Sequence, residues 1–187
     1  MSMHDDDFIK YGRELFVSGL NNSHSGNMSV LDGNNICITR HGSQLGALKA
    51  SDIVCVNLND TKKDNLASVE IVVHRAIYKM TGHSAIVHAH SPATVALSFT
   101  MEEIVPQDEE GKFYFQSIPV IVTKDSIGSQ EVARLAAPIL KDGKIVVVRG
   151  HGVFSASDNL EHAYQWVSSL EHSAKILVYK KIIEMGR

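Results

Sequence analysis

Two histidines separated by one residue are the first candidates for chemistry. His88 and His90 lie in the segment AIVHAH, whose apolar residues are typical of a strand. Because residues i and i+2 of a strand point to the same face, the two imidazoles would project side by side. Two neutral imidazoles at this spacing can bind one divalent metal ion, whereas the same pair on a solvent-facing strand would carry no function. The pair alone leaves both interpretations open.

A third histidine stands in an unusual backbone setting. His151 lies between Gly150 and Gly152, directly after the apolar run KIVVVR. Flanking glycines remove side-chain bulk and allow unusual backbone angles, so the imidazole can be presented into a cleft. An ordinary turn would look the same. Together with His88 and His90, however, His151 completes three protein ligands, and three ligands with one open position are typical of catalytic zinc.

Glu70 is the candidate acid. It falls in the first turn of a helix predicted to begin at Ser68, where the helix dipole favours a carboxylate. A surface acid would satisfy the same preference. Beside an apolar face and near three imidazoles, Glu70 could instead bind the metal or act as a general base. His74 follows one turn later, and we expect a structural role for it.

The helices and strands that must position these residues are interspersed along the chain. Predicted helices cover residues 7–20, 68–80, 92–99, 129–140 and 157–183. Predicted strands cover residues 28–30, 35–39, 53–58, 85–90, 118–122 and 144–148. Interspersed helices and strands favour a sheet covered by helices on both faces. A length of 187 residues is typical of one domain, so we expect a single domain over residues 1–187.

Composition excludes several classes of partner. The net charge of −3 gives no general attraction for nucleic acid or for an anionic membrane. No run approaches the ~20 apolar residues that cross a bilayer, and the first residues, MSMHDDDF, do not resemble a signal peptide. Cys37 and Cys55 each lie in an apolar run, and we expect them to be buried thiols. These features predict a cytoplasmic protein.

Two long segments carry a family resemblance. SVEIVVHRAIYKMTGHSAIVHAHSPATVALS, followed by RGHGVFSASDNLEHAYQWVSSLEHSAKIL, resembles the class II aldolase/epimerase (adducin head) family. The resemblance implies an α/β fold, a three-layer α/β/α sandwich with a central, mostly antiparallel sheet. It also implies that His88, His90 and His151 bind Zn²⁺ or another divalent metal. Glu70 would be a metal ligand at rest and the acid/base during turnover.

The same resemblance implies where a substrate phosphate binds. Ser25-Gly26-Asn27 matches the family's first phosphate-binding element, a turn whose backbone N–H groups can form an anion nest. The second element is usually Thr-Pro-Ser/Thr-Gly and here reads Thr39-Arg40-His41-Gly42. The third is usually Ser-Ser and here reads Ser68-Val69. The phosphate-binding residues expected on this basis are Gly26, Asn27, His41, Gly42 and Ser68.

The implied activity is that of a lyase. A class II aldolase reversibly cleaves a ketose 1-phosphate, such as L-fuculose 1-phosphate, through a metal-stabilised enediolate. The products are dihydroxyacetone phosphate and an aldehyde such as L-lactaldehyde. Epimerase, dehydratase or decarboxylase chemistry needs the same metal site and remains an alternative. A non-catalytic scaffold like the adducin head, or an unrelated metal-dependent hydrolase, would belong to other classes.

Two further expectations follow from the resemblance. The family places a catalytic tyrosine four residues before Gly128-Ser129, and this chain has Lys124 there. Protonation of the departing aldehyde would therefore fall to Lys124 or to a water molecule. The family commonly assembles as a C4 homotetramer with active sites between subunits, and we expect the same assembly here.

Overall fold

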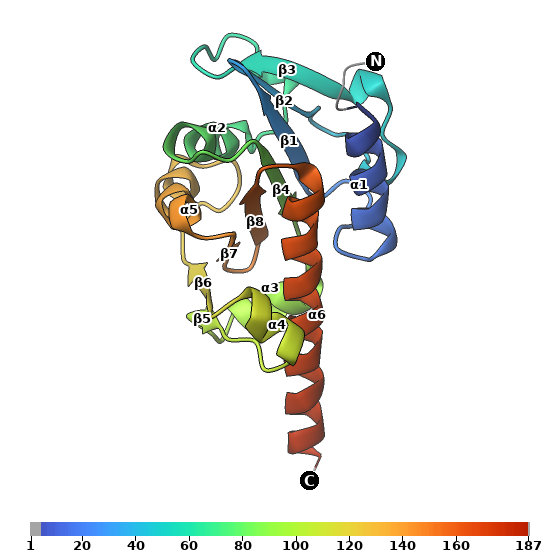
Figure 1. The fold of residues 1–187 in the computed structure, drawn as a ribbon, viewed down its shortest axis with the longest axis vertical. Coiled ribbons are helices and arrows are strands. Elements are labelled where there is room, and N and C mark those ends of the chain that lie inside the picture. Colours follow the sequence, from blue (N-terminus) through green and yellow to red (C-terminus); the bar gives the residue numbers. More distant parts are fainter. Residues whose placement is uncertain (1–4, 187) are drawn as a thin grey trace.

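The computed structural model describes residues 5–186 and places helices on both faces of one sheet (Figure 1). Its α-helices are α1 (Asp5–Val17), α2 (Ile71–Met80), α3 (Pro92–Ser98), α4 (Glu109–Tyr114), α5 (Gln130–Asp142) and α6 (Leu160–Met185). Its strands are β1 (Asn27–Asp32), β2 (Asn35–Thr39), β3 (Ile53–Asn57), β4 (Ala85–Ala89), β5 (Glu103–Ile104), β6 (Ile118–Ile121), β7 (Ile145–Val148) and β8 (Gly152–Ser157). Short 3-10 helices are η1 (Leu45–Ala47), η2 (Ala50–Asp52) and η3 (Asp64–Leu66).

The sheet is mostly antiparallel, as predicted. Its eight strands run in the order β3-β2-β1-β4-β8-β7-β6-β5. Only the β6–β7 pair is parallel. The central strand β4 lies between β1 and β8, although neither of these strands is its neighbour in the sequence. This order brings the end of β4 next to the start of β1 and the start of β8.

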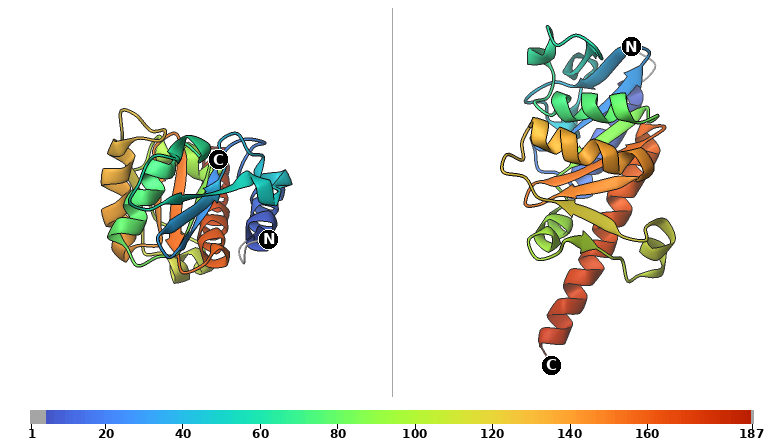
Figure 2. Two further views of the ribbon diagram at one scale, coloured as in Figure 1. Left: turned by 90° about the horizontal axis from the view of Figure 1, so that it is seen from above. Right: turned by 90° about the vertical axis from the view of Figure 1, so that its left-hand side faces the viewer.

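Helices form a layer on each side of the sheet, which confirms the three-layer sandwich. In Figure 2, α2 and α5 lie together over one face, and α6 crosses behind the other. The two hydrophobic cores correspond to these faces. Ile77 of α2 and Val132 of α5 pack with Ile86 and Phe154, whereas α1 and α6 pack against alternate residues of the same strands, such as Val87 and Val153.

The C-terminal part of α6 extends beyond the body of the molecule (Figure 1). Its exposed side chains there include Tyr179, Ile182, Ile183 and Met185. This length does not make α6 a transmembrane helix. Within residues 5–186, no helix combines the length and the apolar character that crossing a membrane requires.

Strand β8, which directly follows His151, was not predicted. Residues 152–157 form β8, so the long helix begins at Leu160 rather than at Ser157. The segment GVFSAS is buried on both faces and carries serines at buried positions. It therefore lacks the alternation of apolar and polar residues that identifies a strand. The short elements β5 and α4 were also not predicted.

The prediction of two buried thiols is wrong. Cys37 and Cys55 form a disulfide, and Cys55 is exposed. The cause is the strand register, because Cys37 of β2 lies directly opposite Cys55 of β3 with 4.0 Å between their Cα atoms. Neither strand sequence alone contains that register.

Candidate metal centre and active site

Three histidines converge where β4 ends and β8 begins. His88 is the penultimate residue of β4, His90 follows that strand, and His151 precedes β8. The Nε2 atoms of His88 and His90 are 3.0 Å apart. One ligand atom from each of the three imidazoles lies within 4.8 Å of the others. The structure thus brings together the three residues that were predicted as metal ligands.

The hydrogen bond of His88 determines which of its nitrogens is available. Nδ1 of His88 donates to the carbonyl oxygen of Val153 at 2.9 Å. With the proton of the neutral ring on Nδ1, Nε2 carries a lone pair that points toward the other two histidines. The ring is also stacked on Phe154, with 4.1 Å between ring centroids. Both partners belong to β8, so this strand orients the ligand.

The surroundings of all three imidazoles favour the neutral ring. Burial lowers the pKa of His88 well below its ordinary value, and the neighbouring His90 and His151 lower it further. Burial and then His151 lower the pKa of His90 to about 4. Burial also lowers the pKa of His151, and the nearby backbone of Ser126 opposes this change. Neutral rings have the free lone pairs that metal binding requires.

Glu70 lies on one side of the histidines. It is the residue before α2, and its side chain does not cap that helix. Instead Oε1 accepts a hydrogen bond from the backbone N–H of Gly128 at 2.9 Å and lies 3.8 Å from Nε2 of His151. Glu70 is only 2% exposed, and its Oε2 has no hydrogen-bond partner among residues 5–186.

The surroundings of Glu70 raise the pKa of its carboxyl above the value in water and so favour the protonated form. Burial raises the pKa of its carboxyl to about 7, the Gly128 N–H opposes this rise, and the charge of Asp125 adds to it. A carboxyl with a pKa near 7 can both donate and accept a proton at neutral pH. Gly128 and Asp125 were not predicted as part of the site, because folding alone brings the Gly128 N–H and the charge of Asp125 to Glu70.

His74 does not contribute to this centre. It is fully buried, and its Nδ1 is 2.6 Å from the hydroxyl of Ser29, which is in turn 2.7 Å from the hydroxyl of Tyr78. Burial lowers the pKa of His74 to about 3. This buried hydrogen-bond chain agrees with the structural role that the sequence predicted.

A cavity of about 280 Å³ opens beside the histidines and Glu70. The register of β1 with β4 pairs Asn27 with His88, so the 25–27 turn lies next to the metal ligands. Gly26 and Gly42 have positive φ angles of 76° and 77°, which glycine adopts readily. The predicted phosphate-binding residues that line the cavity are Gly26, Asn27, His41, Gly42 and Ser68.

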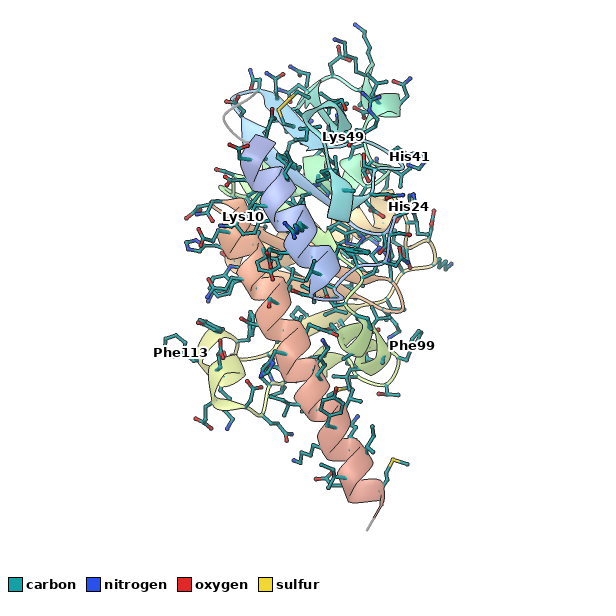
Figure 3. The ribbon with its side chains drawn as sticks, turned by 90° about the vertical axis from the view of Figure 1, so that its right-hand side faces the viewer. Lys10, His24, His41, Lys49, Phe99 and Phe113 are labelled. Carbon is teal, nitrogen blue, oxygen red and sulfur yellow. A yellow bond between two sulfur atoms is a disulfide. The ribbon has the colours of Figure 1, made fainter. Side chains whose placement is uncertain are left out.

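The cavity wall also contains residues outside the predicted set. Basic side chains are added by His24 and Arg40, and Figure 3 shows His24 and His41 on the same side of the molecule. Apolar surface is added by Val69 and Ile127. Further lining residues are Ser25, Thr39 and Ser43. Most of these lining residues lie beside the predicted motifs in the sequence, and that proximity was the only sign in the sequence that they belong to the cavity.

Lys124 lies apart from the cavity. It is exposed, it is not a lining residue, and its backbone N–H donates to Glu131 at 2.9 Å. Within one chain, therefore, Lys124 does not occupy the position that a proton donor for the substrate needs.

The donor set fits a divalent metal ion. Ligands bound at ~2 Å to one ion lie roughly 3–4 Å from one another, close to the 3.0 Å and 3.8 Å separations seen here. The buried Oε2 of Glu70 lacks a partner in the described part of the chain, as expected of a group that faces an ion or a substrate. Three imidazoles with a carboxylate suit zinc and also other first-row divalent metals.

The fold and this centre define a known class of protein. The model of the class II aldolase and adducin N-terminal domain family matches residues 6–178, and the chain belongs to that family. Family membership agrees with the mostly antiparallel sheet and with the histidine cluster, which is positioned to bind a metal.

Several relatives share nearly the full length of the chain. An L-fuculose phosphate aldolase of Methanocaldococcus jannaschii is 31% identical over 95% of this chain and 97% of its own. A crystal structure of L-fuculose-1-phosphate aldolase from Thermus thermophilus superposes with a TM-score of 0.94 at 35% identity, covering 98% of this chain and 96% of that one. A methylthioribulose-1-phosphate dehydratase of Alcanivorax borkumensis is 26% identical over 86% of this chain and 83% of its own.

Proposed function

We propose that this protein is a metal-dependent aldolase that reversibly cleaves a ketose 1-phosphate similar to L-fuculose 1-phosphate. The products would be dihydroxyacetone phosphate and an aldehyde such as L-lactaldehyde. One observation carries the proposal. Three neutral imidazoles, a buried carboxyl with a pKa near 7 and a glycine-containing turn surround a single cavity. The fuculose-phosphate aldolases among the relatives support this choice of substrate.

His88, His90 and His151, with Glu70 at rest, would hold Zn²⁺ or another divalent metal. When bound, this ion supplies stabilisation of the negative charge that cleavage leaves on the ketose fragment. Glu70 would move the proton at C3 of the dihydroxyacetone phosphate fragment. The Gly128 N–H holds Oε1 of Glu70, so the unpartnered Oε2 is the oxygen that would exchange the proton.

The phosphate would bind on the opposite side of the cavity. Backbone N–H groups of Gly26 and Asn27 would form the anion nest, and Ser68 would add a hydroxyl. Arg40 and His41 line the same cavity and are exposed, so Arg40 would contribute positive charge without the cost of burying it, and His41 would add a hydrogen-bonding group. This arrangement would replace the family's second hydroxyl element with basic side chains.

A retro-aldol assay tests the proposal. Metal-loaded protein is incubated with L-fuculose 1-phosphate, and release of dihydroxyacetone phosphate is followed with and without a chelator. We expect release that the chelator abolishes. Glu70→Gln should retain the metal but lose at least 100-fold in kcat, because proton transfer typically contributes that much. A Glu70→Gln enzyme with its metal and near-native kcat would disprove the assignment of the base.

Dehydratase or epimerase chemistry at the same centre is the second candidate. The position of Lys124 favours it, because within one chain Lys124 does not line the cavity, where it could protonate a departing aldehyde. The dehydratase among the relatives supports it as well. Product analysis on a panel of ketose phosphates separates these reactions. No turnover by folded, metal-loaded protein on any member would favour a non-catalytic scaffold.

We also propose a homotetramer with active sites between subunits and a cytoplasmic location. Val69 and Ile127 support the assembly, because these apolar side chains at the cavity are 50% and 64% exposed in one chain and a neighbouring subunit would cover them. Sedimentation analysis of the purified protein measures the assembly. Location in the cytoplasm would expose the Cys37–Cys55 disulfide to reduction, so thiol labelling in fresh lysate should detect both cysteines.

A further inference from the structure

The backbone of His90 is held by a side chain rather than by the sheet. Strand β4 ends at Ala89, and its pairing with β8 ends there too. The N–H of His90 instead donates to Oδ1 of Asn21 at 2.8 Å. Asn21 follows α1 in the sequence, belongs to no helix or strand, and is only 7% exposed. A buried acceptor 69 residues away therefore fixes the backbone of a candidate metal ligand.

The same side chain also contacts the candidate anion-binding turn. A Cβ atom placed on Gly26 would clash with Nδ2 of Asn21 and would lie 2.7 Å from both Oδ1 of Asn21 and the carbonyl oxygen of His88. Gly26 thus has no side chain where the Asn21 amide and the His88 backbone approach it. Asn21 fills the space between this turn and the residues 88–90 segment.

We propose that Asn21 is a positioning residue, which sets the location of His90 relative to the turn that holds Gly26. The inference rests on the proposed function, because it takes His90 as a metal ligand and the turn as a phosphate site. Without the Asn21 acceptor, the N–H of His90 would lose its partner and the segment after β4 would shift. Partners that orient metal ligands typically contribute 10- to 100-fold in metal affinity.

Asn22 provides a matched control. Its Oδ1 accepts hydrogen bonds from the backbone N–H groups of His24 and Ser25, each at 3.0 Å, so it shapes the same turn. Asn22 is exposed and has no hydrogen bond to His90. A change at Asn22 therefore disturbs the turn but leaves the support of His90 in place.

The experiment measures Co²⁺ binding to full-length, chelator-stripped protein by titration and by the visible absorption of the bound ion. Asn21→Leu keeps the branched shape of the side chain and removes the acceptor, whereas Asn21→Asp keeps the acceptor. We expect Asn21→Leu to lose at least tenfold in Co²⁺ affinity and to change the absorption spectrum. Asn21→Asp and Asn22→Ala should remain within threefold of the native affinity, or bind more tightly.

Native affinity and spectrum in Asn21→Leu would overturn the inference. An equal loss in Asn22→Ala, or in Asn21→Asp, would also overturn it, because the hydrogen bond to His90 would then not be the cause. If Asn21→Leu does not fold, Asn21→Ala takes its place, since it removes the acceptor without adding bulk, and the same loss is expected. Failure of the native protein to bind Co²⁺ would instead disprove the metal centre itself.

Discussion

At the scale of single residues, burial controls the charge of the site. His88 is fully buried against Phe154 and donates to the Val153 carbonyl. Burial of a histidine favours the neutral ring, whereas burial of a carboxyl such as that of Glu70 favours the protonated form. The same physical cause thus prepares three metal ligands and an acid/base with a pKa of about 7. Both effects arise mainly from burial rather than from neighbouring charges, so both should largely resist added salt.

His74 predicts a dependence of stability on pH. Its pKa is about 3 in the folded protein and near 6.5 when unfolded. Between these values the unfolded chain binds a proton that the folded protein does not, so the free energy of unfolding falls as the pH falls below 6.5. From pH 6.5 to pH 5 this residue alone should remove about 2 kcal/mol.

Urea unfolding of metal-free protein at pH 7 and pH 5 measures this effect. Asn has a similar polar group near the position of Nδ1, so His74→Asn retains a partner for Ser29 without the titration. The loss of stability on acidification should be about 2 kcal/mol smaller in His74→Asn than in the native protein. The other buried histidines are present in both proteins, so their contributions cancel except for the small effect of His74 on the pKa of His88. Equal losses would show that His74 does not carry the pH dependence.

At the scale of elements, side chains that are distant in the sequence supply hydrogen bonds that an element lacks at its own ends. Helix α3 begins at Pro92, as predicted, but Ser91 before it makes no side-chain capping bond. The buried carboxylate of Glu171 on α6 accepts instead from the N–H groups of Ala93 and Thr94 at 3.0 Å and 2.9 Å. Because α3 begins two residues after His90, α6 also anchors the chain beyond that ligand.

At the start of β8, steric crowding around Gly152 predicts that a larger residue there will destabilise the fold. A Cβ on Gly152 would clash with the carbonyl oxygen of Ala89 and would lie 3.2 Å from Cε1 of His88. Gly152→Ala should therefore lower the free energy of unfolding by about 1–3 kcal/mol, the usual cost of overpacking. Gly82→Ala is the control, because nothing lies within 4 Å of its Cβ position. Thermal unfolding compares the two variants, and similar melting temperatures would contradict the expected clash.

Because a disulfide joins β2 and β3, we predict that a reductant lowers the free energy of unfolding. Its cysteines are 18 residues apart and enclose residues 39–42 of the cavity. Closing a loop of this length restricts the unfolded chain, so reduction should cost about 3 kcal/mol of stability. The urea midpoint with and without dithiothreitol measures this. A variant with both Cys37→Ser and Cys55→Ser should not respond to the reductant, and a native midpoint that is equally insensitive would contradict the prediction.

At the scale of the whole molecule, the strand order assembles the site. The candidate ligands His88 and His151 are 63 residues apart in the sequence, and the turn at Gly26 comes from a third region. They meet because β4 pairs with β1 on one side and with β8 on the other. A metal ion bound there would link segments that the unfolded chain does not hold together, so metal binding and folding should be coupled.

This coupling predicts stabilisation by metal. A ligand at 100 times its dissociation constant stabilises the folded state by about 2.7 kcal/mol, which corresponds to a rise of roughly 5–10 °C in Tm for a chain of this size. Scanning calorimetry of chelated and Zn²⁺-loaded protein should show this rise. His151→Gln should lose most of it while unfolding at a Tm close to that of the chelated native protein. The same rise in His151→Gln would mean that Zn²⁺ binds elsewhere.

The sequence by itself determined the kinds of residue at the site and most of the elements that carry them. The alternation of the predicted strand placed His88 and His90 on one face, and the glycines around His151 indicated a histidine presented into a cleft, because such patterns depend on neighbours along the chain. Only the tertiary structure decided the rest: the Gly128 partner of Glu70, the Val153 partner of His88, the Cys37–Cys55 pair and the support from Asn21. Each of these depends on contacts between distant segments, which local periodicity does not encode.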